Sequence, residues 1–175
     1  QRQMCIRDRY EAVWENGKMS RAEQITSKNT VYEMMNTVTS DGDKVAVAWI
    51  ENSQNDPFQN EGTECIKVKE YADGVWKEKT VSSGLSGVGG LAVSYVGDQL
   101  VAAYENTDEN AKITLLTDID EKIIDGYGMY VEKDSLYYNT EKGLQEYDLA
   151  TGAVSRLGLD AIGDYTVICL LYTSP

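Results

Sequence analysis

A run of amide, carboxylate and aromatic side chains near the middle of the chain is the sequence feature best suited to bind a ligand. The run separates two apolar stretches and spans residues 52–64. Amide and carboxylate oxygens match the hydroxyl groups of a sugar, and an aromatic ring matches the C–H face of a sugar ring. The same oxygens suit calcium, and the same residue types also build solvated turns. The candidate ligand-binding residues are Asn52, Asn55, Asp56, Phe58, Asn60 and Glu61.

The absence of histidine limits the chemistry open to the chain. None of the 175 residues is a histidine, which excludes Ser-His-Asp and Cys-His nucleophile pairs, HExxH zinc sites and imidazole bases from this sequence. Catalysis would need carboxylates, tyrosine, lysine or a metal held by oxygen. We predict no catalytic residue, no metal ligand and no cofactor, and Cys65 is interpreted as a small core residue.

Two further segments resemble known motifs without matching them. The segment "TDIDEKIID" has Lys122 and Ile123 where a calcium-binding loop needs an oxygen ligand and a glycine. The segment "SSGLSGVGG" lacks the Gly-Lys-Ser/Thr ending of a phosphate-binding loop. We interpret the second segment as a flexible link.

The composition restricts the classes of partner. The net charge of −13 repels phosphate backbones and anionic lipid surfaces. No continuous apolar stretch is long enough to span a membrane. We therefore predict no nucleic-acid partner and no membrane span in this sequence.

The two ends of the chain look foreign to the protein. Codons that encode residues 1–9 contain ATGTGTATAAGAGACAG, and codons that encode residues 169–175 contain most of its reverse complement. Both ends resemble a translated transposase-type sequencing adapter, and such segments carry no information on the fold. We expect residues 10–168 to be an internal piece of a longer protein. Cys65 is then the only native cysteine of the piece.

Alternating apolar residues predict an all-β fold. In "DGDKVAVAWIEN" the residues Val45, Val47 and Trp49 point to one side, while Ala46, Ala48 and Ile50 point to the other. A strand that is apolar on both sides must be covered on both sides.

This strand pair recurs along the chain. "TSDGDKVAVAWIEN" (39–52) resembles "SYVGDQLVAAYEN" (94–106), and "VEKDSLYYNTEKG" (131–143) is a looser copy. Repeats of four short strands are typical of propeller blades, although a β-sandwich is the alternative. The predicted fold is a partial β-propeller of about three four-stranded antiparallel blades. The units are 10–27 (end of one blade), 31–82, 90–125, 127–158 and 159–168 (start of the next). We interpret six aromatic residues as packing between blades: Trp14, Trp49, Trp76, Tyr104, Tyr137 and Tyr138.

The chain resembles bacterial extracellular β-propellers, including sialidase-like repeat proteins. The resemblance rests on "DGxxxxxAWxEN", on the turn from Tyr71 to Trp76, and on "YDLATGAV" at Tyr147 to Val154. It implies a secreted or cell-surface, non-catalytic propeller segment that presents a face to a glycan or a surface protein and contacts further blades of its own chain. One alternative is part of a sialidase-like carbohydrate-active enzyme with its catalytic residues outside this sequence, because residues 10–168 hold only Arg21 and Arg156 of the arginines such a site needs. Another is a purely structural propeller module.

Overall fold

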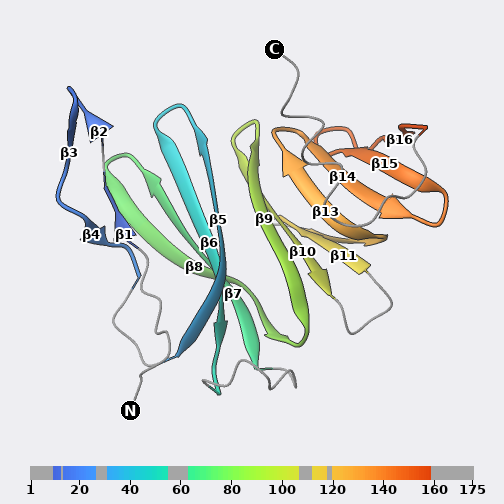
Figure 1. Ribbon diagram of the computed structural model, residues 1–175, viewed down its shortest axis with the longest axis horizontal. Helices are drawn as coiled ribbons and strands as arrows, with labels where there is room; N and C mark the ends of the chain where they lie inside the picture. Colours follow the sequence, from blue (N-terminus) through green and yellow to red (C-terminus); the bar gives the residue numbers. More distant parts are fainter. Residues whose placement is uncertain are drawn as a thin grey trace.

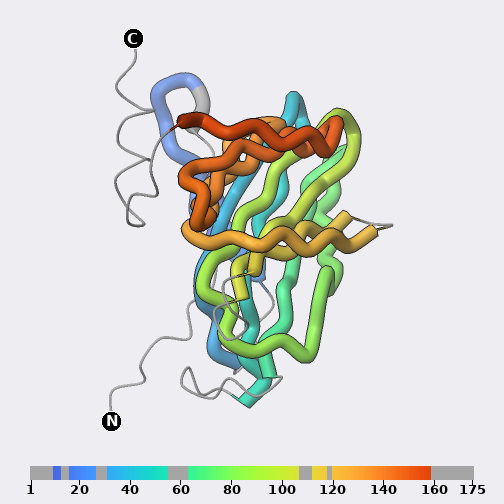
Figure 2. The backbone as a smooth tube through the Cα atoms, turned by 90° about the vertical axis from the view of Figure 1, so that its right-hand side faces the viewer, coloured from blue at the N-terminus to red at the C-terminus, as the bar shows by residue number. Residues whose placement is uncertain are grey.

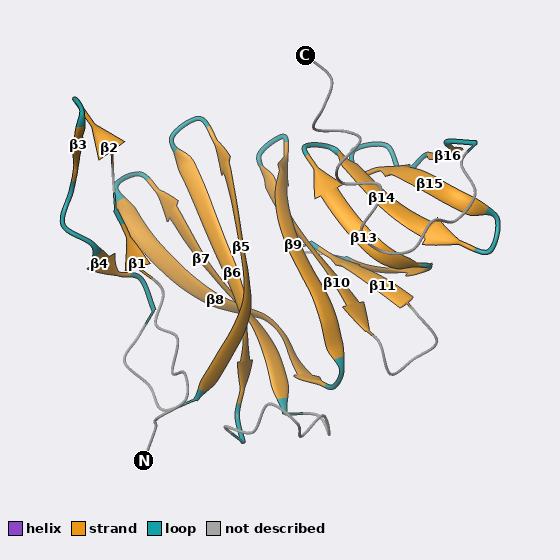
Figure 3. Ribbon diagram, in the orientation of Figure 1, coloured by secondary structure: helices purple, strands orange, loops and turns teal. Residues whose placement is uncertain are grey.

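The computed structural model is built from strands and tight turns. It describes residues 10–12, 14–26, 31–54, 63–106, 112–117 and 120–158, and no helix occurs within these ranges (Figure 3). The all-β prediction is confirmed. The two adapter-like ends and the predicted unit 159–168 lie outside the described residues.

Three four-stranded sheets form the body of the molecule, and in each sheet the strands pair antiparallel in chain order. Sheet 1 contains β5 (Tyr32–Asp41), β6 (Lys44–Asn52), β7 (Glu64–Ala72) and β8 (Val75–Leu85). Sheet 2 contains β9 (Val88–Val96), β10 (Gln99–Asn106), β11 (Lys112–Leu116) and β12 (Glu121–Asp125). Sheet 3 contains β13 (Tyr127–Glu132), β14 (Ser135–Thr140), β15 (Gly143–Asp148) and β16 (Val154–Arg156). The N-terminal segment adds β1 (Tyr10–Glu11), β2 (Trp14–Glu15), β3 (Lys18–Met19) and β4 (Glu23–Gln24) as two short pairs.

The predicted four-stranded antiparallel units are therefore confirmed. The prediction that the glycine-rich segment "SSGLSGVGG" is a flexible link between the first two units was wrong. Residues 82–85 belong to β8 and residues 88–90 to β9, which leaves Ser86 and Gly87 between the sheets. Gly84 is the extra residue of a bulge, because Glu64 pairs with Leu85 while the next residue of β7 pairs two positions earlier. Its φ of 71° suits a glycine in this position. The segment is glycine-rich because it bends at the end of a sheet.

The second strand of each of the first two sheets is buried on both faces, as the alternation predicts. Ala46, Ala48 and Ile50 are 0% exposed and belong to a core shared with sheet 2. On the opposite face, Trp49 packs with Ile25 of the N-terminal segment. In sheet 2 the same division places Ala102 and Tyr104 against sheet 1, and Ala103 against sheet 3. The strands of sheet 2 thus contribute to two cores, one on each side.

The sheets lie broadside against one another, with the first strands of successive sheets in contact. Figure 1 shows the sheets fanned from β5 through β9 to β13, and β9 contacts both of its counterparts. Figure 2, which looks along the stack, shows the last strands of sheet 3, in red, running across the long blue to green strands of sheets 1 and 2. In each gap the apolar contact lies between broad faces of the sheets. No closed sheet occurs in the described part of the chain.

Polar contacts at the margins join each sheet to the next. The Glu64 carboxylate accepts a hydrogen bond from the Val88 backbone N–H at 3.0 Å, and the Tyr95 hydroxyl donates to Glu70 at 2.8 Å. Burial, followed by the bond to Glu70, raises the pKa of the Tyr95 phenol. In the second gap the Glu105 carboxylate accepts from the Gly128 N–H at 3.0 Å. A carboxylate of one sheet therefore meets the backbone of the first strand of the next sheet in both gaps.

The turn between the first two strands has the same form in all three sheets. Two residues connect the strands, and the first of them is Gly42, Gly97 or Lys133. Their φ angles are 57°, 58° and 51° respectively. Lys133 therefore adopts a left-handed conformation that costs an L-residue on the order of 1–2 kcal/mol.

We expect a leucine at position 48 to separate sheets 1 and 2. Ala48 is 0% exposed within their shared core, so Ala48→Leu should lower the free energy of unfolding by about 1–3 kcal/mol. Val38 of the same sheet is 66% exposed, and Val38→Leu should change it by less than about 0.5 kcal/mol. Urea unfolding monitored by circular dichroism measures both variants. Equal midpoints for the two would contradict the packed interface.

We expect glycine to improve the turn of sheet 3. Lys133→Gly relieves the positive φ and should raise the free energy of unfolding by about 0.5–1 kcal/mol. The reverse change at the equivalent turn, Gly97→Lys, should lower it by a similar amount, because a side chain there meets no atom within 4 Å and only the backbone is strained. Thermal melts of both variants test this. A shift of the same sign in both would be inconsistent with equivalent turns.

Candidate functional site

The predicted ligand-binding loop follows β6 in the sequence and precedes β7. We call the end of the sheets at which each second strand ends and each third strand begins the loop end. These positions are Asn52 and Glu64 in sheet 1, Asn106 and Lys112 in sheet 2, and Thr140 and Gly143 in sheet 3. Asn52 is 0% exposed, and its Oδ1 accepts a hydrogen bond from the Gln54 N–H at 3.0 Å, so its side chain orders the start of the first loop. Asn55, Asp56, Phe58, Asn60 and Glu61 lie outside the described residues, and ligand binding by this loop remains a prediction.

A cavity of about 620 Å³ opens between sheets 2 and 3 at the loop end. We call it the main cavity. Sheet 2 contributes the start of β11 and the end of β12. Sheet 3 contributes the start of β13, the end of β14, the following turn and β15. Its lining residues are Lys112, Asp125, Gly126, Tyr127, Tyr138, Thr140, Glu141, Lys142 and Gln145.

The lining combines phenol rings with hydrogen-bonding groups of both signs. Two lysines, Lys112 and Lys142, are balanced by two carboxylates, Asp125 and Glu141. Tyr138 is 4% exposed, and this burial raises the pKa of its phenol. The cavity is therefore close to neutral within a chain whose net charge is −13.

Local sequence explains how the cavity keeps its shape. Gly126 lies between β12 and β13, where a Cβ atom would approach the Tyr138 ring to 2.4 Å and the Asn139 carbonyl to 2.9 Å. On the other side, the Thr140 hydroxyl donates to the Gly143 carbonyl at 3.0 Å and accepts from the Lys142 N–H at 3.1 Å. This turn places Glu141 and Lys142 at the rim.

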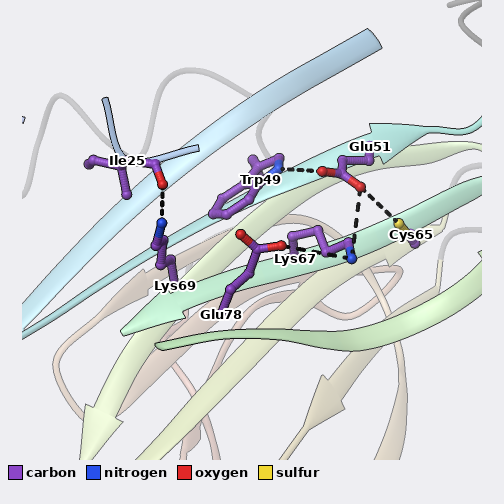
Figure 4. Close-up of polar contacts among 7 residues, drawn as sticks. All are labelled: Ile25, Trp49, Glu51, Cys65, Lys67, Lys69 and Glu78. Atoms are coloured by element: carbon purple, nitrogen blue, oxygen red, sulfur yellow. Dashed lines mark hydrogen bonds and ion pairs between the residues drawn. The ribbon is translucent and has the colours of Figure 1, made fainter. Parts of the chain in front are cut away.

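A second polar cluster lies on the face of sheet 1 that meets the N-terminal segment (Figure 4). The Trp49 indole donates to Glu51 at 3.4 Å, and the Lys67 ammonium lies 3.9 Å from Glu51 and 4.0 Å from Glu78. Cys65 is partly exposed, not a fully buried core residue, and its Sγ lies 3.9 Å from a Glu51 oxygen. Desolvation, followed by the Glu51 charge, raises the pKa of the Cys65 thiol. The thiol is therefore held protonated, which is unfavourable for a nucleophile.

Hydrogen bonds also hold the N-terminal segment on this face of sheet 1. Lys69 donates a hydrogen bond to the Ile25 carbonyl (Figure 4). The Trp76 indole donates to Glu11 at 3.1 Å. These bonds and the packing of Ile25 on Trp49 cover the face of sheet 1 that sheet 2 does not.

The remaining chemistry-bearing groups are dispersed. Arg21 and Arg156 are both exposed and neither lines the main cavity. Among the described residues, no group of three or more acidic, cysteine or histidine side chains is placed to hold a metal ion. The described ranges also contain no helix able to cross a membrane.

No family model matches this sequence, and no curated protein is detectably similar to it.

The main cavity was missed at the level of sequence because its residues come from two repeats. The usable signal lay in the turn positions: "DGYG" at 125–128 and "TEKG" at 140–143 are polar, glycine-containing and fall at the same end of adjacent units. Tyr138 was expected to pack between sheets, and it belongs to the core between sheets 2 and 3. Its second role, as a wall of the cavity, depends on the close approach of Gly126.

We expect Gly126→Ala to displace the Tyr138 ring and lower the free energy of unfolding by about 1–3 kcal/mol. Gly90→Ala is the matched control, because a Cβ there meets atoms at 3.4 Å and beyond; its effect should stay within about 0.5 kcal/mol. Chemical unfolding measures stability, and near-ultraviolet circular dichroism reports the tyrosine environment. An unaltered spectrum and midpoint for Gly126→Ala would show that the ring is not held by this contact.

Proposed function

We propose that the chain is part of a β-propeller and that it works as a non-catalytic binding segment, with its ligand at the loop end. The observation that carries this proposal is the main cavity, an opening of about 620 Å³ lined by tyrosines and by charged groups of both signs. Cavities of this size, with rings and a few converging polar groups, are typical of small-ligand sites.

The arrangement of the sheets supports a propeller over a two-sheet sandwich. In a sandwich, two sheets enclose one core and each sheet keeps a solvated face. Here sheet 2 contributes apolar residues to two cores, one against sheet 1 and one against sheet 3. The first strands β5, β9 and β13 are in contact from sheet to sheet, as strands near a common axis would be. An experimental structure of the complete ring that this proposal implies should show further sheets continuing this order, and a closed two-sheet core would contradict the proposal.

Carbohydrate is the ligand class that the lining supports best. Neutral sugars have no charge to complement, and their hydroxyl groups both donate and accept, which suits Asp125, Glu141, Gln145 and the lysines together. The C–H faces of sugar rings suit Tyr127, which is partly exposed at the opening. The resemblance to extracellular propellers supports a location outside the cell or on its surface.

The test is binding of the purified chain to a broad glycan array, followed by titration calorimetry on the best glycan. Gln145→Trp places a bulky ring in the main cavity and should weaken binding by at least about tenfold, since it takes space from a sugar ring. Val154→Trp adds the same ring at a position that is 57% exposed on β16, and should leave binding unchanged. Absence of binding to every glycan, or equal binding by the parent chain and Gln145→Trp, would overturn the proposal.

A further inference from the structure

A second, smaller cavity lies on the other face of sheet 2, also at the loop end. It measures about 210 Å³ and opens between sheets 1 and 2. Its lining includes Leu85, Tyr104, Asn106, Lys112, Thr114 and Glu121. We call it the small cavity. Lys112 lines both cavities.

The two cavities occupy equivalent places in successive gaps. Each has one wall formed by a tyrosine from the second strand of the later sheet: Tyr104 of β10 in the small cavity and Tyr138 of β14 in the main cavity. Each has another wall formed by the link between the sheets, at Ser86 and at Gly126 respectively. A feature that recurs from gap to gap suits a ligand built from repeated units.

Lys112 stands on a polar ridge between the cavities. In the register of sheet 2 it lies opposite Asn106 on β10 and opposite Asp125 on β12. An amide, an ammonium and a carboxylate thus cross the end of the sheet side by side. Asn106 belongs to the small cavity and Asp125 to the main cavity, so the ridge offers hydrogen-bonding groups to a ligand passing from one to the other.

The volumes assign different roles to the two cavities. Small-ligand sites usually measure about 300–1,000 Å³, and the main cavity lies within this range at about 620 Å³. The small cavity, at about 210 Å³, lies below the range. It fits an added unit of a ligand already held in the main cavity better than a complete ligand.

We infer that the loop end binds a linear, uncharged oligosaccharide, with neighbouring sugar units in the main and small cavities and Lys112 between them. This inference rests on the proposed function and adds the length and charge of the ligand. Charge carries the second point: the two cavities together have two lysines, the shared Lys112 and Lys142, and three carboxylates, Asp125, Glu141 and Glu121. A polyanionic chain would lose more to the carboxylates than it gains from the lysines.

The experiment measures affinity as a function of ligand length. The probes are uncharged series of α-1,4-glucose, β-1,4-glucose, β-1,4-xylose and α-1,6-mannose, each from the monosaccharide to the hexasaccharide, titrated calorimetrically into the purified chain. In the series that binds, affinity should rise by about tenfold or more when the ligand becomes long enough to fill both cavities, because a charged hydrogen bond and a second set of contacts are added. Longer members should then give no further gain.

Three variants test which part of the sugar each cavity holds. Lys142→Met alters only the main cavity and should weaken short and long sugars by similar factors. Glu121→Gln alters only the small cavity and should weaken the long sugars alone. Lys112→Met should weaken all lengths and remove most of the gain with length. Lys77→Met, on the exposed edge strand β8, is the control and should bind as the parent chain does.

The outcomes separate this inference from the proposed function. Affinity that does not change with length, or a length gain that Glu121→Gln and Lys112→Met leave intact, overturns the two-cavity inference while the carbohydrate site stands. Binding only to acidic glycans on the array overturns the inference that the ligand is uncharged, while the carbohydrate site again stands. Binding to a peptide and to no sugar overturns the inference and the carbohydrate function together, while the sheets remain unaffected.

Discussion

The structure depends on one constraint: a strand that is apolar on both faces must have a neighbour on both faces. Burial of apolar surface contributes about 25 cal/mol per Å², so leaving one face of β6 or β10 in water would forfeit several kcal/mol. Alanines at the centre of these strands let the adjoining sheet approach closely; Ala46, Ala48 and Ala102 are each at most 3% exposed. The stacked order of the sheets follows from this constraint, with sheet 2 as the member that has a neighbour on both sides.

Polar groups fix the register of this stack, since apolar faces alone would allow sliding. The hydrogen bonds that the Val88 N–H donates to Glu64 and the Gly128 N–H donates to Glu105 satisfy backbone groups where the chain enters the next sheet. Glu64 is only 3% exposed, so a backbone N–H left there without a hydrogen-bond acceptor would lower the stability of the fold. By contrast, the ion pair of Lys44 and Asp98 joins sheets 1 and 2 with the Asp98 side chain fully exposed, and adds little to stability.

The sheets were predictable because their patterns each lie within one segment of the sequence. The main cavity was not predictable because its residues come from separate segments. Alternation identified the two faces of β6, and the copy of residues 39–52 at 94–106 placed β10, because both signals lie within one segment. The glycine-rich residues 82–90 were misassigned because a bulge and a link share the same composition. The main cavity gathers Lys112, Tyr127 and Lys142 from separate turns. Turn residues of this kind carry no period, and only the packing of one sheet on another brings them together.

The position of the cavities follows from the sizes of the residues along the second strands. Toward the middle of β10 the residues that face a neighbour are Ala102 and Ala103, and the sheets close on them. Toward the loop end the facing residues become Tyr104 in one gap and Tyr138 in the other, both almost fully buried. A phenol ring keeps the neighbouring sheet farther away than a methyl group does, and close packing cannot then be restored beyond it. Each ring therefore seals a core on one side and borders a cavity on the other. The spacing of the sheets thus sets the spacing of the two cavities that we propose as binding subsites.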